Sequence, residues 1–152
     1  MGYTFGVGRE APVFTLTAVD GTEVALKSYR GDWLPILLFY SPGTPDMATR
    51  LTAMSAAADQ LWGFRGQLLG VCDAPAGAQR ALAEQAGGVA FPMLVDEGAV
   101  VARAYGAYSP RTGAVQPAAY IVDRAGKIVW VGDGADALNP AALLAALESA
   151  TR

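Results

Sequence analysis

The sequence predicts an α/β fold in which helices flank a mixed central sheet, with a β-hairpin near the N-terminus. Three observations lead to this prediction. Short apolar runs alternate with stretches of helical periodicity along the chain. Two pairs of β-forming segments are separated by turn sequences that contain glycine. No repeat, low-complexity tract or linker interrupts this order, so we expect one domain over residues 1–152.

The hairpin and the first buried strand are expected before residue 41. Residues 13–17 alternate in character and are rich in β-forming side chains. The turn sequence Asp20-Gly21 then leads to residues 23–26, which predicts an antiparallel pair. Residues 34–40 are apolar at nearly every position, which is typical of a central strand that is covered on both faces.

A helix is predicted next, over residues 44–64. From Met47 to Leu61, apolar side chains recur at spacings of four and three, so they share one face of the helix. Thr44 is expected to cap the helix and Pro45 to occupy its first turn.

The second half of the chain continues the alternation of strands and helices. The apolar run that ends at Cys72 predicts a second buried strand, and the stop signal Gly87-Gly88 follows an alanine-rich helix. Asn139 is expected to cap the last helix. The predicted elements are strands over residues 67–72, 92–95, 120–123 and 127–131, the last two as a second hairpin, and helices over residues 76–86, 98–106 and 139–149.

Composition narrows the classes of function. Hydrophobic residues make up 53% of the 152 residues and charged residues 16%, which is typical of a packed globular protein. The net charge of −3 arises from acidic and basic residues spread along the chain, so no basic stripe is available for nucleic acid. The apolar runs are far shorter than the roughly 20 residues of a membrane-spanning helix, and no signal sequence is visible. We therefore expect a cytoplasmic protein without nucleic-acid or membrane partners.

The chain contains one cysteine and no histidine. Cys72 has no second cysteine with which to form an internal disulfide. The lack of histidine removes the commonest metal ligand and the side chain best suited to proton transfer near neutral pH. We predict neither a metal nor a cofactor.

Three blocks of the sequence, in this order along the chain, resemble a known family: GREAPVFTLTAVDGTEVALKSYRGDWLPILLFYSPGTPDM, then LLGVCDAPAGAQRALAEQAGGVAFPMLVDEG, then QPAAYIVDRAGKIVWVG. They resemble successive blocks of the peroxiredoxins, the alkyl hydroperoxide reductase and thiol-specific antioxidant (AhpC/TSA) family. The resemblance covers nearly the whole chain. It implies a thioredoxin-like fold, a thiol-dependent peroxidase activity of the antioxidant oxidoreductase type, a small hydroperoxide and a thiol reductant as ligands, and pairing into a homodimer.

The resemblance also implies where the active site lies. After the central strand the family reads Pro-x-x-x-Thr-x-x-Cys, and the cysteine is the peroxidatic nucleophile. Pro42 and Thr44 match the proline and the threonine, although only Gly43 separates them, two residues fewer than in the family. The position of the cysteine then holds Met47.

The family's site contains an arginine just before the strand predicted at residue 120. In this sequence that position falls on Gln116 or Pro117. Pro117 also resembles the cis-proline that other thioredoxin-fold proteins place opposite their active thiol. The sequence leaves open whether the Gln116–Pro117 bond is cis.

Met47 cannot take part in the family's reaction. Peroxide reduction requires a thiolate that attacks the O–O bond, and a helix N-terminus and a cation lower the pKa of the thiol to supply it. A thioether has no proton to lose and no route through sulfenic acid. Two interpretations of Met47 remain: an apolar side chain that fills the emptied pocket, or a peroxide sensor that is slowly oxidised to the sulfoxide.

Cys72 also has two interpretations. In a parallel arrangement the end of its strand would lie beside the loop at residues 41–46, so a relocated nucleophile is conceivable. Against this, the neighbouring Asp73 would raise the pKa of the thiol, and a cysteine at a strand end commonly serves as a small buried apolar group.

The sequence therefore predicts a peroxiredoxin-family protein with a vestigial site at Pro42, Thr44, Met47 and Gln116. Thiol peroxidase chemistry would be lost because Met47 and Gln116 replace the cysteine and the arginine, and a binding or accessory role would remain. The alternative is a working one-cysteine peroxidase or thiol reductase that uses Cys72 as its nucleophile.

Overall fold

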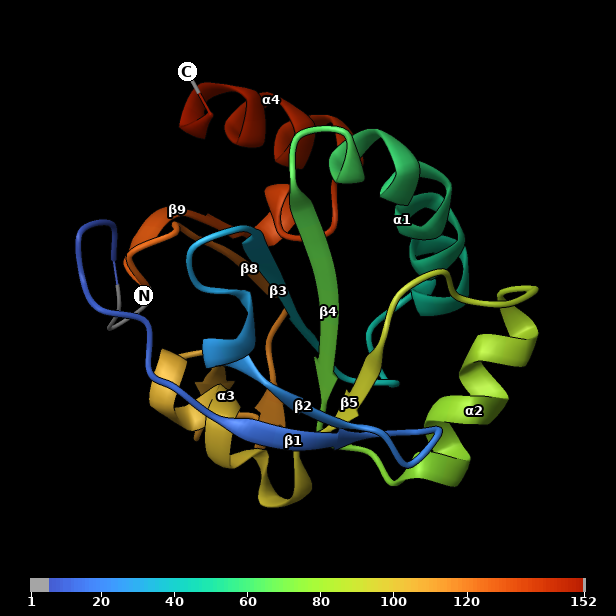
Figure 1. The fold of residues 1–152 in the computed structure, drawn as a ribbon. Coiled ribbons are helices and arrows are strands. Elements are labelled where there is room, and N and C mark those ends of the chain that lie inside the picture. Colours follow the sequence, from blue (N-terminus) through green and yellow to red (C-terminus); the bar gives the residue numbers. More distant parts are fainter. Residues whose placement is uncertain (1–5, 152) are drawn as a thin grey trace.

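The computed structural model describes residues 6–151, apart from the side chain at position 135. At its centre is a seven-stranded mixed sheet with the strand order β2-β1-β5-β4-β3-β8-β9 (Figure 1). The strands are β1 (Thr15–Ala18), β2 (Glu23–Ala25), β3 (Leu34–Tyr40), β4 (Gly66–Cys72), β5 (Met93–Val95), β8 (Ala118–Val122) and β9 (Ile128–Asp133), and a small separate sheet pairs β6 (Tyr108–Ser109) with β7 (Ala114–Val115). The helices are α1 (Met47–Trp62), α2 (Ala76–Gln85), α3 (Val100–Tyr105) and α4 (Pro140–Ala150), and short 3₁₀ turns are η1 (Leu26–Tyr29), η2 (Glu97–Ala99) and η3 (Gly134–Asp136).

The two longest strands, β3 and β4, form the middle of the sheet. They run parallel in continuous register, from Leu34 opposite Gly66 to Tyr40 opposite Cys72. Every residue of β3 is buried, which confirms the prediction of a central strand covered on both faces. The two predicted hairpins are also confirmed, because β1 pairs with β2 and β8 with β9 in antiparallel fashion.

Helices cover both faces of the sheet, and the side chains of β3 alternate between two hydrophobic clusters. Ile36, Leu38 and Tyr40 belong to the cluster beneath α1, α2 and α4, which we call the α1 cluster. Leu37 and Phe39 belong to the cluster beneath α3, which we call the α3 cluster. This period of two is what an extended chain imposes, and it confirms the predicted α/β architecture with helices on both faces.

Aromatic rings and their hydroxyl groups fix α3 to the sheet. The ring of Tyr105 lies 5.2 Å from that of Phe39 and 5.1 Å from that of Tyr120, measured between centroids. The Tyr105 hydroxyl donates to the Pro12 carbonyl at 2.7 Å, and the Tyr120 hydroxyl donates to the Tyr105 carbonyl at 2.7 Å. These buried polar groups are satisfied, so α3 has a defined position despite its short length.

The start of α1 differs from the prediction. The helix begins at Met47, and its N-cap residue is Asp46, in the left-handed conformation (φ 58°) and without a side-chain cap. Thr44 and Pro45 therefore precede the helix, and the expected Thr44 cap is wrong. Thr44 instead closes a turn, in which its N–H donates to the Ser41 carbonyl at 3.0 Å and its hydroxyl accepts from the Ser41 N–H at 3.5 Å.

Two further details correct the predicted elements. The segment at 98–106 is a shorter helix, because Gly98 (φ 75°) and Ala99 (φ 56°) in η2 have left-handed backbones and α3 begins only at Val100. The β6–β7 hairpin was not predicted, since each strand has only two residues and carries no periodic signal. The ends of other elements lie within two residues of the prediction, as expected at frayed termini.

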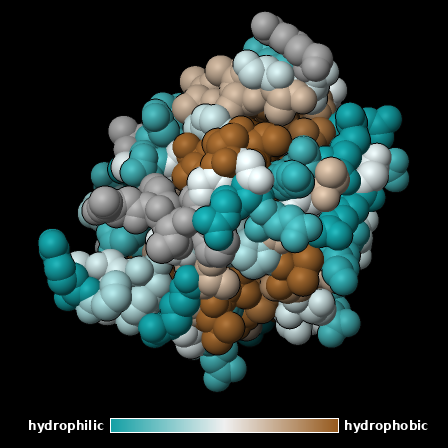
Figure 2. Space-filling model, turned by 90° about the vertical axis from the view of Figure 1, so that its left-hand side faces the viewer, coloured by the Kyte–Doolittle hydropathy of each residue, from teal (hydrophilic) through white to brown (hydrophobic). Residues whose placement is uncertain are grey.

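Few large hydrophobic side chains are exposed in the described part of the chain: Val7, Val13, Trp62 and Val100. Trp62 stacks against Trp33 with 4.3 Å between ring centroids. Figure 2 shows that hydrophobic side chains gather in two separate areas on one face of the molecule, and the lower area lies at the end where Figure 1 places α3 and the start of β1.

The predicted cap of α4 is confirmed and provides a test of the fold's local energetics. The Asn139 side-chain oxygen accepts from the N–H groups of Ala141 (3.0 Å) and Ala142 (3.3 Å). We expect Asn139→Ala to lower the free energy of unfolding by about 1 kcal/mol, because two helix N–H groups lose their acceptor. Chemical denaturation measures this loss. Asn139→Ser retains a capping oxygen and should stay within about 0.5 kcal/mol of the wild type, and an equal loss in both variants would refute the role of the cap.

Candidate functional site

The residues that the sequence singles out meet at one end of the sheet. Tyr40, the last residue of β3, lies opposite Cys72, the last residue of β4. On its other side β3 pairs with β8, with Phe39 opposite Ala118, so the preceding segment at 116–117 continues past the end of β3. The loop at 41–46, Met47, Cys72 and Gln116 therefore come from adjacent chain segments at this end, as the carboxyl ends of parallel strands require.

Hydrogen bonds between neighbours shape the loop at 41–46. Besides the Ser41–Thr44 turn, the Ser41 hydroxyl accepts from the Gly43 N–H at 3.2 Å. The Arg50 side chain reaches back from α1, and its Nε donates to the Pro45 carbonyl at 3.1 Å. The Thr44 hydroxyl is thus held by its own loop, and the Arg50 side chain that reaches this loop has a backbone partner.

Met47 is a buried packing residue. Its exposed fraction is 3%, and it lies in the α1 cluster together with Tyr40, Leu51, Met54 and Cys72. The predicted apolar phase of the helix is confirmed by the burial of Met47, Leu51, Met54 and Leu61 on one face. A flexible thioether suits an irregular space between a helix and a sheet.

Cys72 is also buried, with an exposed fraction of 1%. Burial raises the pKa of its thiol from 9.0 to about 12. The Ala74 N–H bond lowers the pKa, and the carboxylates of Asp73 and Asp96 raise it further. A thiol in these surroundings carries almost no thiolate at neutral pH, whereas a reactive cysteine is exposed and lies near positive charge.

A buried glutamine holds the end of β4 in place, and the sequence prediction missed it. Gln79 has an exposed fraction of 0%, and its Nε2 donates to the carbonyls of Cys72 (3.2 Å), Ala74 (2.8 Å) and Leu94 (3.2 Å). The N–H of Asp96 also donates to the Cys72 carbonyl, at 2.9 Å. The only signal in the sequence is the spacing of three between Gln79 and the buried Leu82 on the predicted helix.

Tyr40 fills the space beside these residues. Its hydroxyl is buried and has no hydrogen-bond partner among the described residues. A Cβ atom added to Gly70 would lie 3.0 Å from the Tyr40 hydroxyl oxygen, so the ring lies against the glycine of the neighbouring strand. Burial raises the pKa of Tyr40 well above its usual range, and the phenol stays neutral.

Gln116 is directed into the β6–β7 hairpin. Its Nε2 donates to the Thr112 hydroxyl at 3.0 Å, and its backbone N–H donates to the Ala107 carbonyl at 2.7 Å. The peptide bond between Gln116 and Pro117 is trans, as are the other bonds in the described part of the chain. The neutral amide at 116 supplies no cation to the end of β3.

Comparisons with known proteins identify the family of this chain. The profile of the AhpC/TSA family matches residues 7–131. The chain belongs to the AhpC/TSA family. It is 31% identical over 130 residues to a protein described as a putative peroxiredoxin of Mycobacterium tuberculosis strain CDC 1551, covering 80% of this chain and 81% of that protein. It is 30% identical to peroxiredoxin 2 of Thermoplasma acidophilum over 132 residues, which are 82% of this chain and 65% of that protein.

The fold is likewise that of AhpC/TSA proteins. The structure of Mycobacterium tuberculosis AhpC superposes with a TM-score of 0.84 at 21% identity, over 96% of this chain and 93% of that one. The chain is thus a peroxiredoxin-like protein with a thioredoxin-like fold, as its sequence blocks predicted.

The described residues also form grooves away from the end of β3. Two grooves of about 550 Å³ each are lined by residues other than those at the end of β3. Within residues 6–151, no group of three or more Cys, Asp and Glu side chains is placed to hold a metal ion. No described helix is both long and apolar enough to cross a membrane.

The packing role of Met47 can be measured. We expect Met47→Ala to lower the free energy of unfolding by about 2–5 kcal/mol, because it leaves a cavity between α1 and β3. Met47→Leu conserves volume and should cost less than about 1.5 kcal/mol. Chemical denaturation of both variants provides the measurement. A cost for Met47→Ala below about 0.5 kcal/mol would show that the side chain does not pack as described.

The raised pKa of Cys72 predicts a pH dependence of stability. Because the folded pKa of about 12 lies above the unfolded value of 9.0, the thiol favours the folded state fully below pH 9, and this contribution is lost as the pH rises toward 12. We expect the free energy of unfolding of the wild type to fall by on the order of 2 kcal/mol more than that of Cys72→Ala between pH 8 and pH 11. Val71→Ala, which keeps the thiol on the same strand, should retain the wild-type pH dependence. Parallel curves for the wild type and Cys72→Ala would contradict the buried thiol.

Proposed function

We propose that this AhpC/TSA protein has lost the thiol peroxidase reaction and keeps a binding or accessory role. The observation that carries the proposal is that neither sulfur at the site can supply a thiolate. Met47 is a buried thioether, and Cys72 is a buried thiol with a pKa of about 12. Attack on the O–O bond requires the anion, so both routes to the first step of turnover are closed.

The position of the arginine supports the same proposal. The polar side chain at the family's arginine position is Gln116, which is neutral and bonded to Thr112. A cation there would lower the pKa of a thiol and stabilise the negative charge that develops on the leaving oxygen. The vestigial site, made of Pro42, Thr44, Met47 and Gln116, thus retains the loop and lacks both chemical groups.

A one-cysteine peroxidase or thiol reductase that uses Cys72 is the second candidate function. The register between Tyr40 and Cys72 favours it, because it brings the thiol beside the end of β3. This second function would require a local opening of the fold that exposes the Cys72 sulfur. It would also require deprotonation of a thiol whose pKa is raised by burial and by the negative charges of Asp73 and Asp96.

The binding role concerns the loop at 41–46 and its surroundings. A small hydroperoxide or a thiol compound is the class of ligand that the family relationship suggests, and a cytoplasmic homodimer is the corresponding state of the protein. Oxidation of Met47 to the sulfoxide would signal peroxide only after α1 opens, because the sulfur is buried in the α1 cluster.

Peroxide consumption with dithiothreitol as reductant tests the proposal. We expect the wild type and Cys72→Ser to remove hydrogen peroxide no faster than dithiothreitol alone, since neither offers an accessible thiolate. Met47→Cys restores a thiol at the start of α1 and should show slow turnover, and Met47→Cys combined with Gln116→Arg should be at least about tenfold faster, because the added cation lowers the pKa of the new thiol.

The control variants separate the two candidate functions. Turnover by the wild type that disappears in Cys72→Ser would establish the second candidate and refute the loss of activity. Met47→Ser offers a matched control, since it introduces a small polar group of similar size to cysteine at the same position without a sulfur nucleophile. Activity in Met47→Ser equal to that in Met47→Cys would mean that position 47 is not where the reaction occurs.

A further inference from the structure

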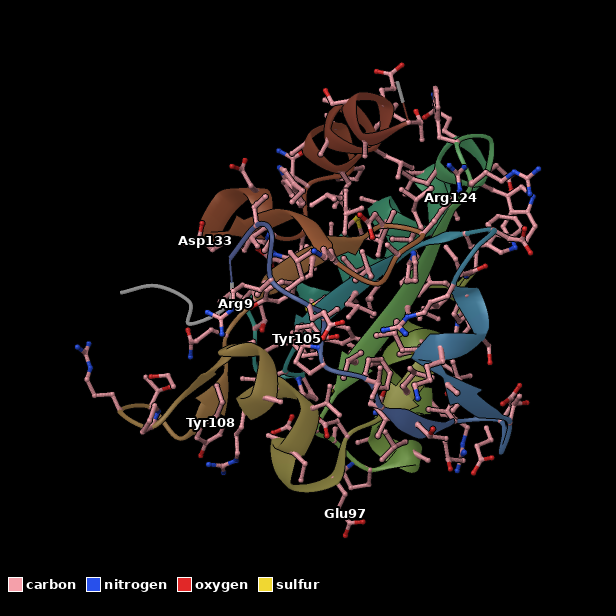
Figure 3. All side chains as sticks on the ribbon, turned by 60° about the vertical axis from the view of Figure 1, so that its left-hand side comes forward. Arg9, Glu97, Tyr105, Tyr108, Arg124 and Asp133 are labelled. Atoms are coloured by element: carbon pink, nitrogen blue, oxygen red, sulfur yellow. The ribbon has the colours of Figure 1, made fainter. Side chains whose placement is uncertain are left out.

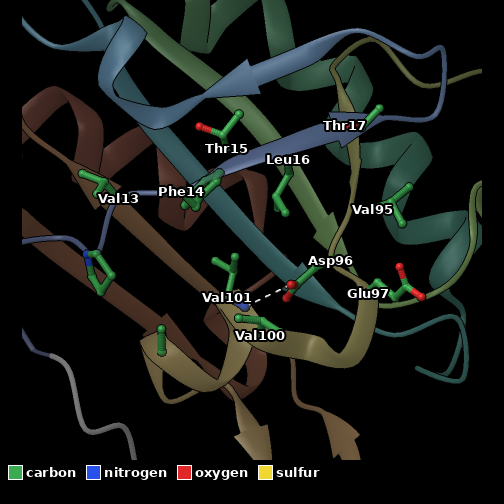
Figure 4. Close-up of a pocket in the computed structure, with 12 residues that line it drawn as sticks. Val13, Phe14, Thr15, Leu16, Thr17, Val95, Asp96, Glu97, Val100 and Val101 are labelled. Carbon is green, nitrogen blue, oxygen red and sulfur yellow. Dashed lines mark hydrogen bonds between the residues drawn. The ribbon is translucent and has the colours of Figure 1, made fainter.

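A groove of about 550 Å³ lies between β1 and α3 (Figure 4). Phe14 and Leu16 extend from β1 toward Val101 of α3, so the walls are apolar. The groove borders the α3 cluster, whereas Met47 lies in the α1 cluster on the other face of the sheet. It is therefore separate from the vestigial site.

The groove exists because β5 ends early. β5 pairs with β1 only at Val95 opposite Thr17 and Leu94 opposite Ala18. The chain then turns away at Asp96, whose carboxylate accepts from the N–H groups of Val101 (3.0 Å) and Ala102 (2.9 Å) at the start of α3. The first half of β1 consequently has a neighbouring strand on the β2 side and none on the β5 side among the described residues.

The backbone of β1 presents an open edge to this groove. Even-numbered residues bond toward β2, as shown by the Phe14 carbonyl that accepts from the Leu26 N–H. Odd-numbered residues bond toward β5, as shown by the Val19 N–H that donates to the Met93 carbonyl. By this alternation the N–H and C=O of Thr15 face the groove. The N–H and C=O of Val13 make no hydrogen bond within the described part of the chain.

The rim of the groove is apolar on both sides and acidic at one end. Val13 is 49% exposed and Val100 66% exposed, although both are aliphatic. Glu97 lies at the end where β5 departs, and its carboxylate points outward (Figure 3). The described lining residues include two acids, Asp96 and Glu97, and no lysine or arginine. Since Asp96 is occupied in capping α3, Glu97 is the acid at the rim that is available to a ligand.

We infer that this groove binds an extended segment of a partner protein, which adds to β1 as an antiparallel strand in the line of β5. Backbone groups of Thr15 and Val13 would pair with the segment, and alternate apolar side chains would enter between Leu16 and Val101. A lysine or arginine near the N-terminal end of the segment would meet Glu97 by charge complementarity. An open strand edge with apolar walls is the surface that a β-strand completes.

A synthetic peptide tests this inference on the full chain. The probe is the fluorescein-labelled decapeptide Lys-Lys-Val-Thr-Val-Thr-Val-Thr-Gly-Ser, followed by fluorescence anisotropy. We expect saturable binding with a dissociation constant of about 10–100 μM, and slower hydrogen exchange at the Thr15 amide when the peptide is bound. Peptides that are N-methylated on every valine or on every threonine distinguish strand addition from simple apolar adsorption, because only the version that blocks the edge facing β1 should lose binding.

Matched variants locate the site. Val100→Lys should weaken binding about fivefold, whereas Val7→Lys, which adds the same charge at an equally exposed valine outside the groove, should not. Glu97→Gln should weaken binding about two- to fivefold, and Glu84→Gln on α2 should have no effect. The inference is overturned if the probe does not bind at 1 mM, which is about tenfold above the expected range, or if Val100→Lys and Val7→Lys bind the probe equally well. It is also overturned if light scattering shows a dimer that Val100→Lys dissociates, since the occupant of the groove would then be a second copy of the chain. Peroxide turnover does not enter this test, so its outcome is independent of the proposed loss of chemistry.

Discussion

The parallel pairing of β3 with β4 is the constraint on which the remaining structure depends. Seven residues of each strand are aligned, and the last pair joins Tyr40 to Cys72. Because both strands are buried on both faces, their side chains at this end must be apolar or neutral. The chain leaves β3 into the loop at 41–46 and leaves β4 toward α2, so the same pairing that builds the sheet also determines that Cys72 lies under helices. A thiol there contributes to packing, and its pKa rises as a direct result.

Hydrogen bonds from Gln79 and Asp96 fix the carboxyl end of β4. The Cys72 carbonyl accepts from both the Gln79 side chain and the Asp96 N–H. The Gln79 side chain donates to the carbonyls of Cys72 in β4, Ala74 in the turn after it and Leu94 in β5, which ties α2 to both strands. To expose the thiol, the protein would have to break several of these bonds together, and buried amide bonds are costly to leave unmade. The local geometry therefore opposes a relocated nucleophile more strongly than the neighbouring charge of Asp73, which was the argument available from sequence.

Sequence reasoning succeeded where periodicity is long and failed where geometry is local. Many residues agree in the apolar run at 34–40 and in the spacing of three and four from Met47 to Leu61. The strand and the helix that these patterns predicted are both present, as β3 and α1. The start of α1 depends on a few torsion angles, and the left-handed backbone of Asp46 has no counterpart in the sequence pattern. The burial of Gln79 was missed as well, because its spacing of three from Leu82 is a weak signal for a single polar residue on an alanine-rich helix. The positions of Met47 and Cys72 at one end of the sheet followed from topology, while the direction of the Gln116 side chain required the β6–β7 hairpin.

Asp96 links the end of β4 to the groove between β1 and α3. Its N–H donates to the Cys72 carbonyl at the end of β4, and its carboxylate caps the first turn of α3, which forms one wall of the groove. The hydroxyl bonds of Tyr105 and Tyr120 hold the other end of α3 to the sheet. The groove wall is thus preformed, which would lower the ordering cost of the strand addition that we infer. Asp96 therefore supports both the end of β4, where Cys72 is buried, and the α3 wall of the groove on the opposite face of the sheet.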